Sequence, residues 1–343
     1  MTQAPHRHRS EPLPLDTAGQ RGLDGGAPKP ADGHWATLGE NTSALGIWLL
    51  WGTHKVLGRS IFRLCVFPVV VVYWAANPKA RAASLQYLQR IEAAYGVIGQ
   101  APGWRETLRH FLSFADTLLD KLLAISGRYP FERVRCEGLE QVLRTMDSGR
   151  GAIIVTAHVG CLELCRALAE HDKRLALTVL VHTAHARRFN AILRRLDPGG
   201  RVCLLEVGEV SAATAVLLGE CVERGELIAI SGDRVPINAS KTLALPFLGV
   251  EARFPVGAYV LASLLNCPLF FMGCMRKGEG HLVIFEPLAQ RLALPRSRRA
   301  EALREVAKDY VQRLEDFVRR APYEWFNFFS FWDQGTETCP IEP

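Results

Sequence analysis

The sequence lacks the short motifs that mark several common enzyme classes. It contains no G-x-S-x-G segment, which argues against a serine hydrolase with a nucleophile elbow. It has no G-x-x-x-x-G-K-[ST] segment, which argues against a P-loop ATPase, and no G-x-G-x-x-G after an expected strand, which weakens a dinucleotide-binding interpretation. Its nine cysteines are scattered and include no C-x-x-C pair. They are therefore interpreted as reduced core residues of a cytosolic protein, and not as disulfides or a zinc framework.

The chain also lacks a strong charge of either sign. Its net charge is +6, from 41 Lys and Arg against 35 Asp and Glu, which is too small an excess to indicate nucleic-acid binding by itself. No nucleic-acid module is recognisable. Anionic lipid headgroups or an acidic protein partner remain compatible with this balance. Hydrophobic residues make up 48% and charged residues 22%, which indicates one large folded domain or two smaller ones and excludes wholesale disorder.

The sequence has no hydrophobic run long enough to predict a membrane-spanning helix. The apolar segments 44–51 and 64–76 both fall below the roughly 18 residues expected of a spanning helix. Basic residues lie between the two segments, Pro68 interrupts the second, and aromatic side chains lie in both. This pattern predicts an interfacial or re-entrant hairpin that contacts a membrane. The alternative is a buried helical hairpin in a soluble core.

The rest of the chain divides into regions by its hydrophobic periodicity. Residues 1–34 have no apolar h-region of a signal peptide, and we expect a disordered tail there. Helical spacing predicts helices near 78–98 and 104–122, so residues 35–128 are interpreted as a helical membrane-associating region. Residues 129–333 are expected to form an α/β domain, and 334–343 a second tail.

The α/β domain is predicted from alternating strand and helix patterns. Strands are expected at 152–156, 175–181, 202–205, 227–231, 268–274 and 281–285, and helices at 139–146, 161–170, 186–197, 211–224, 257–266 and around 303–318. Such alternation is typical of a mostly parallel sheet with helices on both faces. Ligands bind at the carboxyl ends of the strands in sheets of this kind.

The segment most informative about chemistry is AIIVTAHVGCLELCRALAE, residues 152–170. His158 follows a buried strand, Gly160 permits a tight turn, and Glu163 begins the next helix. Residues five apart on a continuous helix point about 140° away from each other, so His158 and Glu163 meet only if His158 lies off the helix. A neutral imidazole oriented by a carboxylate can take a proton from an alcohol. The alternative is a histidine that caps the turn beside a solvent-facing glutamate.

A metal site has weak support. His182-x-x-His185 has the spacing of a metal pair, but no third ligand lies at a convincing spacing.

Several blocks in this order resemble the bacterial lipid A late acyltransferases, which are lauroyl and myristoyl transferases of the lysophospholipid acyltransferase superfamily. The blocks are Trp35, Leu57-Gly58-Arg59, Ala80-Arg81-Ala82-Ala83-Ser84, the H-x-x-x-x-E segment at His158 and Glu163, Gly232-Asp233-Arg234, Leu245-Pro246-Phe247-Leu248-Gly249, Pro255-Val256-Gly257 and the ending Tyr323–Trp332. The aromatic ending is closer to the acyltransferases found with aryl-polyene clusters. This departure affects the expected acceptor, and not the expected chemistry.

The resemblance implies a glycerolphosphate-acyltransferase-like α/β fold and an O-acyltransferase at the cytoplasmic face of the bacterial inner membrane. A fatty acyl group would pass from an acyl carrier protein or CoA thioester to a hydroxyl of a lipid or glycolipid, with no metal, ATP or redox cofactor. His158 would be the general base and Glu163 would orient it. The expected substrate-binding residues are Arg187, Arg188, Asn190, Asp233, Arg234, Phe247 and Gly249.

Each of these residues also has a plainer interpretation. Arg234 is equally expected in a salt bridge with Asp233, Arg187 and Arg188 in a solvated basic face, and Phe247 and Gly249 in an ordinary β-turn. The arginines that flank the last helix provide a basic surface for an acidic carrier protein or simply solubilise the helix; they are Arg296, Arg298, Arg299, Arg319 and Arg320.

Three other functions remain open at this point. The first is the same chemistry on a lysophospholipid or an ornithine lipid. The second is a lipid-binding relative that performs no chemistry, and the intact His158 and Glu163 argue against it. The third is a soluble nucleotide-binding α/β protein, which the aromatic hairpin and the missing glycine-rich loop disfavour.

Overall fold

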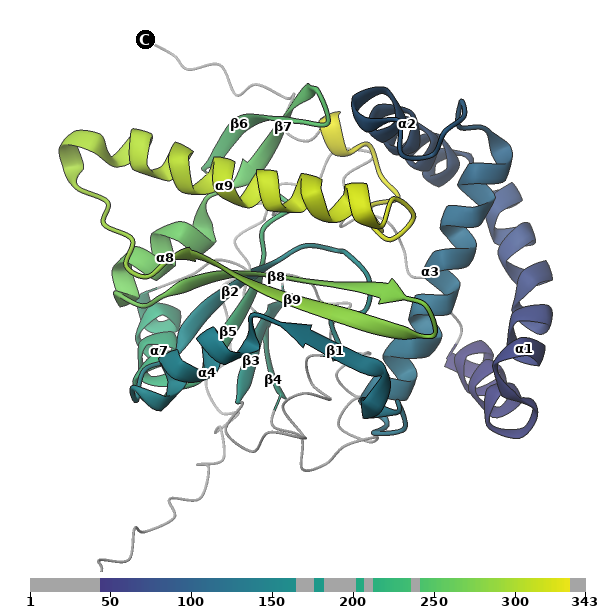
Figure 1. Cartoon of the computed structure of the whole chain (residues 1–343), viewed down its shortest axis with the longest axis horizontal. Coiled ribbons are helices and arrows are strands. Elements are labelled where there is room, and N and C mark those ends of the chain that lie inside the picture. Colours follow the sequence, from purple (N-terminus) through teal and green to yellow (C-terminus); the bar gives the residue numbers. More distant parts are fainter. Residues whose placement is uncertain (1–43, 165–175, 182–201, 207–211, 236–240, 334–343) are drawn as a thin grey trace, which may run out of the picture.

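A seven-stranded sheet forms the centre of the molecule (Figure 1). The computed structural model describes residues 44–164, 176–181, 202–206, 212–235 and 241–333. The strands are β1 (Val134–Glu137), β2 (Ala152–Thr156), β3 (Leu177–Val181), β4 (Val202–Glu206), β5 (Leu227–Ser231), β8 (Leu269–Lys277) and β9 (Gly280–Ala289), in the order β1-β9-β8-β2-β5-β3-β4. Strands β8, β2, β5, β3 and β4 are parallel to one another, whereas β9 is antiparallel to β8. The predicted mostly parallel α/β sheet is therefore confirmed.

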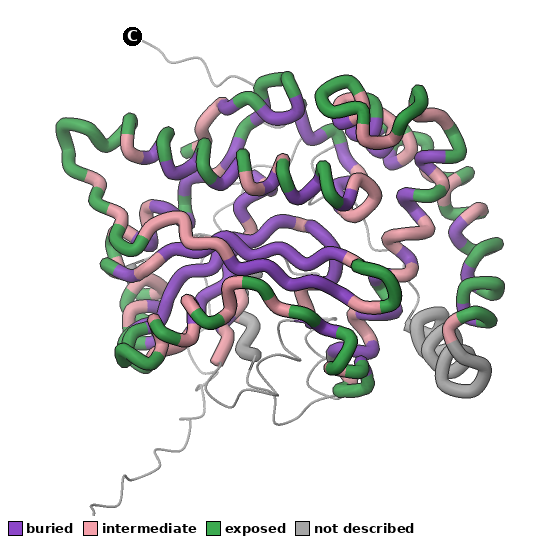
Figure 2. Tube along the Cα trace, viewed as in Figure 1, coloured by how far each residue is buried: buried purple, intermediate pink, exposed green. Residues whose placement is uncertain are grey.

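The sheet buries both of its faces, as Figure 2 shows. Successive side chains of a strand point to opposite faces, so Ile153 and Val155 of β2 join one hydrophobic cluster while Ala152 and Ile154 join the other. All five residues of β2 are buried, which explains its continuous apolar sequence. The helices around the sheet are α2 (Pro78–Tyr95), α3 (Trp104–Ile125), α4 (Leu139–Asp147), α7 (Ala212–Glu223), α8 (Gly257–Leu265) and α9 (Arg299–Arg320).

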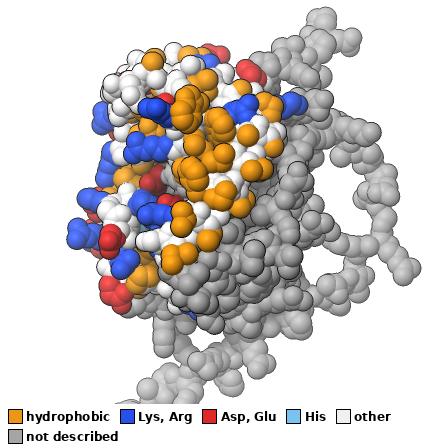
Figure 3. Space-filling model, turned by 90° about the vertical axis from the view of Figure 1, so that its right-hand side faces the viewer, with side chains coloured by type: hydrophobic (Ala, Val, Ile, Leu, Met, Phe, Trp, Pro, Cys, Tyr) orange, Lys and Arg blue, Asp and Glu red, His pale blue; other side chains and the backbone are white. Residues whose placement is uncertain are grey.

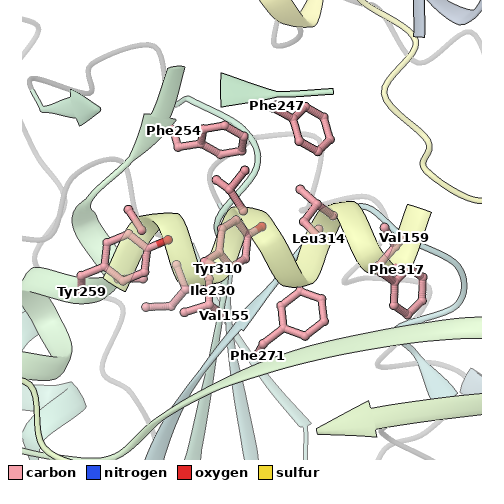
Figure 4. Close-up of a cluster of buried hydrophobic side chains, with 14 of the residues drawn as sticks. Val155, Val159, Ile230, Phe247, Phe254, Tyr259, Phe271, Tyr310, Leu314 and Phe317 are labelled. Atoms are coloured by element: carbon pink, nitrogen blue, oxygen red, sulfur yellow. The ribbon is translucent and has the colours of Figure 1, made fainter. Parts of the chain in front are cut away.

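Helix α9 covers one face with a row of large side chains (Figure 4). Tyr310 lies between Tyr259 of α8 and Phe271 of β8, and its hydroxyl donates to the backbone oxygen of Thr156 at 2.9 Å. This bond ties α9 to the last residue of β2. The centre of the sheet is thereby held where the chain leaves β2 for the predicted site.

The sequence prediction missed three of the strands. Strand β1 was not predicted, and neither was the hairpin of β6 (Thr242–Phe247) and β7 (Val250–Pro255), which forms a separate two-stranded sheet. Leu248 and Gly249 form its turn with positive φ values of 52° and 77°. Both strands are short, and Pro246 and Pro255 obscure their alternation.

The prediction of an N-terminal hairpin is wrong, because residues Ala44–Ala76 form one helix, α1, that contains Pro68. Phe62, Val66 and Val70 of α1 are buried against α3. The side of α1 that faces away from α3 exposes apolar side chains that we call the outer stripe; it consists of Ile61, Leu64 and Val72. Arg59–Ala76 is long and apolar enough to cross a membrane, by length and composition alone.

Buried charges fix α1 to the rest of the molecule. Asp120 of α3 is fully buried and accepts hydrogen bonds from Arg59 of α1 at 2.8 and 2.9 Å and from Arg276 of β8. His281 of β9 lies 3.5 Å from the same carboxylate. A more exposed pair joins Arg63 to Asp116 one turn away. One carboxylate thus connects the N-terminal helices to two strands of the sheet.

We predict that Asp120→Ala lowers the free energy of unfolding by about 3–5 kcal/mol, because it leaves Arg59 and Arg276 without their buried acceptor. The matched variant Asp116→Ala removes a more exposed pair and should cost at most about 1 kcal/mol. Denaturant unfolding of both variants measures the difference. Equal losses would contradict the assignment of Asp120 as the connecting charge.

Candidate active site

The predicted base lies in the turn that follows β2. Two residues beyond the end of that strand, the His158 side chain is 34% exposed. The turn requires glycine at position 160, where φ is +53° and an added Cβ would overlap the backbone oxygen of Cys274. The chain therefore bends sharply after the strand, and His158 lies off the following segment as the sequence predicted.

Asp233 occupies the equivalent position after the neighbouring strand. β5 is paired with β2 so that Thr156 lies opposite Ser231, and His158 and Asp233 each follow by two residues. His158 Nδ1 lies 2.8 Å from Asp233 Oδ1, and the His158 backbone N–H donates to Asp233 Oδ2 at 2.9 Å. Ser231 also donates to Oδ1, at 2.7 Å. The two carboxyl ends of adjacent parallel strands thus bring an imidazole and a carboxylate together.

The electrostatics of this pair favour a neutral imidazole beside an ionised carboxylate. Burial alone would raise the pKa of Asp233, but the charges of His158 and Arg234 and the hydrogen bonds from His158 hold that pKa well below its usual range. Burial and the positive charge of Arg234 lower the pKa of His158, and Asp233 offsets part of this effect. An ionised Asp233 accepts a hydrogen bond from the Nδ1–H group of His158, so Nε2 carries the lone pair that a general base needs.

Glu163 makes its contacts away from the His158–Asp233 pair. Its Oε1 lies 3.1 Å from Lys121 Nζ of α3, and its Oε2 lies 3.9 Å from the Cys161 thiol. Burial alone would lower the pKa of Lys121, but the negative charge of Glu163 outweighs this effect. The pKa of Lys121 is therefore raised, and the lysine stays charged. The residue that accepts a hydrogen bond from the His158 ring in this structure is Asp233.

The C-terminal segment 323–332, which we call the strap, crosses directly over the turn at His158–Gly160. Val159 and Trp325 form an antiparallel bridge. The Phe326 N–H donates to His158 O at 2.8 Å, and the Gly160 N–H donates to Glu324 O at 2.8 Å. The aromatic ending that the resemblance singled out is therefore part of the site.

The residues predicted to bind substrate are not all found at the site. Arg234 lies in the site, where its Nε donates to Asn327 at 2.8 Å. Phe247 is fully buried, with its ring centroid 5.3 Å from that of Trp325, so it packs beneath the strap. Gly249 lies in the β6–β7 turn with open space beside it. Arg187, Arg188 and Asn190 lie outside the described residues.

Sequence reasoning missed Lys121, Ser231, Trp325 and Asn327 as members of the site. It also assigned Asp233 to the substrate and not to the imidazole. One signal was available, because His158 and Asp233 stand at the same offset from the ends of two buried strands. The neighbouring strand order, which makes that offset meaningful, follows from the three-dimensional pairing.

Within the described ranges, no group of three or more His, Cys, Asp or Glu side chains is arranged to hold a metal ion. His182 and His185, the pair considered from the sequence, lie outside these ranges.

Comparison with known proteins identifies the family. The family model described as bacterial lipid A biosynthesis acyltransferase matches residues 121–333, which is more than half of the chain. The chain belongs to this family. A search of curated proteins finds no match. The matched range contains the turn at His158, Asp233 and the whole strap, so the family match covers the candidate site.

Membership has direct consequences for activity. Lipid A biosynthesis acyltransferases are O-acyltransferases of lipid metabolism that use an acyl donor and a lipid acceptor, and the family is associated with the bacterial inner membrane. The match does not extend to the aryl-polyene detail inferred from the aromatic ending.

Proposed function

We propose that this acyltransferase moves a fatty acyl group from an acyl carrier protein or CoA thioester to a hydroxyl of a lipid or glycolipid, with His158 as general base and Asp233 as the residue that orients it. The observation that carries this proposal is the 2.8 Å contact between His158 Nδ1 and Asp233 Oδ1 on a half-exposed ring. Glu163, the partner expected from the H-x-x-x-x-E motif, is held by Lys121.

The proton path follows from this arrangement. Nε2 of His158 takes the proton as the acceptor hydroxyl attacks the thioester carbonyl, and a C–O bond forms. The tetrahedral intermediate then expels the thiolate as the C–S bond breaks, and the imidazolium returns the proton to sulfur. Asp233 stabilises the imidazolium between these two steps, as the carboxylate does in a catalytic triad.

Positive charge stabilises the oxyanion of the intermediate. The backbone amides of the turn already have partners, because the Val159 N–H donates to Ala157 O and the Gly160 N–H donates to Glu324 O. Arg234 and Lys121 both carry positive charge near the ring, and after burial and Arg234 the charge of Lys121 makes the smaller contribution to lowering the pKa of His158. We assign the oxyanion to these two cations, where preorganised donors are worth a few kcal/mol each, roughly.

The basic residues proposed to dock a carrier protein lie at the two ends of α9. Arg296, Arg298 and Arg299 precede or begin the helix, while Arg319 and Arg320 end it, about 30 Å away at 1.5 Å per residue. Only the second group adjoins the strap, which begins three residues later and bridges to Val159. We therefore propose that an acidic carrier protein docks at the Arg319–Arg320 end.

The membrane contact that we propose is the outer stripe of α1. Figure 3 shows a continuous apolar area on the side of the molecule where α1 lies. The other side of α1 is joined to α3 through Arg59, Arg63 and Trp74, whose indole donates to Thr107 at 3.0 Å. A span would draw these ion pairs into hydrocarbon, so we propose that α1 lies along the surface of the cytoplasmic leaflet.

The first test compares active-site variants. His158→Ala should reduce acyl transfer by about 100-fold or more, because it removes the base, and Asp233→Asn should come close to this loss. Glu163→Gln should retain most activity. The assay uses acyl carrier protein and CoA thioesters with lipid A precursor, lysophospholipid and ornithine-lipid acceptors, and mass spectrometry detects the product.

Circular dichroism controls for folding of each variant. Undiminished transfer by a folded His158→Ala protein would eliminate the proposed base. A Glu163→Gln loss larger than that of Asp233→Asn would return the orienting role to Glu163.

A second test addresses the donor. The double variant Arg319→Glu, Arg320→Glu should raise KM for an acyl carrier protein thioester by about tenfold, because like charges repel, and leave KM for acyl-pantetheine unchanged. The matched variant Arg296→Glu, Arg298→Glu changes the same charge at the far end of α9. An equal effect of both double variants would contradict a docking surface beside the strap.

A third test addresses the membrane. Leu64→Glu with Val72→Glu places two charges in the outer stripe and should abolish most co-flotation with phosphatidylglycerol-containing vesicles. Val216→Glu with Leu264→Glu changes equally exposed apolar residues on α7 and α8 and should float like the unmodified protein. Loss of flotation in the control pair alone would refute the assignment.

A further inference from the structure

Asn327 joins the two charged residues that flank the proposed base. Its side chain is 2% exposed. The Asn327 amide Nδ2 donates to Asp233 Oδ2 at 2.9 Å, and its Oδ1 accepts from Arg234 Nε at 2.8 Å. One buried side chain thus bonds a carboxylate through one end and a guanidinium through the other.

This position demands both a donor and an acceptor. Only a side-chain amide offers the two on adjacent atoms at this length, because a carboxylate cannot donate when ionised and an aliphatic group does neither. Asn327 therefore fits between Asp233 and Arg234 in a way that neither Asp nor Leu would. The requirement points to a role in placing charges and not only in filling the core.

The Asp233 carboxylate is fixed from both sides by this arrangement. Its Oδ2 accepts from Asn327, from the Trp325 indole at 3.0 Å and from the His158 backbone N–H. Its Oδ1 faces the His158 ring and Ser231. With three donors on one oxygen, the carboxylate keeps the orientation in which the other oxygen meets Nδ1.

The strap, which carries Asn327, is held in place by the fully buried His110. His110 of α3 donates from Nε2 to Trp325 O at 3.0 Å and accepts from Ser84 of α2 at Nδ1, at 2.9 Å. Arg234 Nη2 donates to Phe326 O at 3.1 Å. The strap is thus anchored on one side to the N-terminal helices and on the other to the charged residues of the site.

We infer that Asn327 is a positioning residue of the acyltransferase, which holds the Asp233 carboxylate on the His158 ring and the Arg234 guanidinium beside it. The inference rests on the proposed function in taking His158 as the base. It extends the machinery from the catalytic turn to the C-terminal strap.

The direction in which the loss of Asn327 shifts the pKa of His158 can be predicted. Asp233 loses one hydrogen bond and becomes a stronger acceptor, and Arg234, whose charge lowers the pKa of His158, loses an anchor. Both changes raise the pKa of His158. The acid limb of the pH–rate profile should therefore move to higher pH, because the base becomes unprotonated only above its new pKa.

The experiment compares Asn327→Leu, which removes both bonds, with Asn327→Asp, which keeps only the acceptor. We expect kcat to fall by about 10- to 100-fold in Asn327→Leu, with KM changed less than kcat, because the charges are misplaced and the substrate surfaces are not. NMR titration of isotope-labelled histidine in the full chain should show a raised His158 pKa in both variants. We expect the larger rise in the His158 pKa in Asn327→Asp, because this variant adds a negative charge.

Thr178→Val provides a matched control, because it removes a buried hydroxyl from β3. It should lower stability without moving the pH profile. An unshifted His158 pKa in a folded Asn327 variant overturns the inference, and if Asn327→Leu does not fold, Asn327→Asp decides. Absence of acyl transfer by the unmodified enzyme would reject the proposed function alone, since the NMR titration tests the coupling without turnover.

Discussion

The contact between His158 and Asp233 is the interaction on which the site depends. Neither residue is held by its own strand alone, because each lies in a turn beyond the strand end. The register between β2 and β5 brings the turns to the same height, and the strap then closes over both. A shift of either strand by one residue would separate the imidazole from its carboxylate. The central sheet therefore sets the 2.8 Å distance between His158 Nδ1 and Asp233 Oδ1.

The charges around the ring balance in a way that suits proton transfer. Asp233 and Glu163 supply negative charge, while Arg234 and Lys121 supply positive charge, and the imidazole between them stays neutral. A neutral ring can accept a proton, and the nearby carboxylate then compensates the charge that develops. Burial and the same two cations lower the pKa of the ring. In the proposed mechanism these cations would also stabilise the oxyanion that forms during acyl transfer.

Sequence patterns predicted the fold where periodicity was strong and failed where tertiary pairing decided. The stripes of α3 and α9 and the apolar run of β2 led to correct elements. The N-terminal hairpin was wrong, because Pro68 and the intervening arginines suggested a break, whereas α3 supplies Asp116 and Asp120 as partners that keep the helix continuous. The position of His158 in a turn after β2 was predicted, but its hydrogen-bond partner was not, because the order of β2 and β5 in the sheet is absent from any local pattern.

The aromatic side chains of the strap account for its fixed position over the turn at His158. Trp325 is fully buried among Tyr87, Phe247 and Phe331, so the backbone around it cannot move without opening the core. That rigidity fixes the Trp325 indole and the Asn327 amide, both of which donate to Asp233. A mobile strap would let the carboxylate rotate away from Nδ1. The packing of the aromatic residues therefore determines how precisely the donors around one buried carboxylate are held.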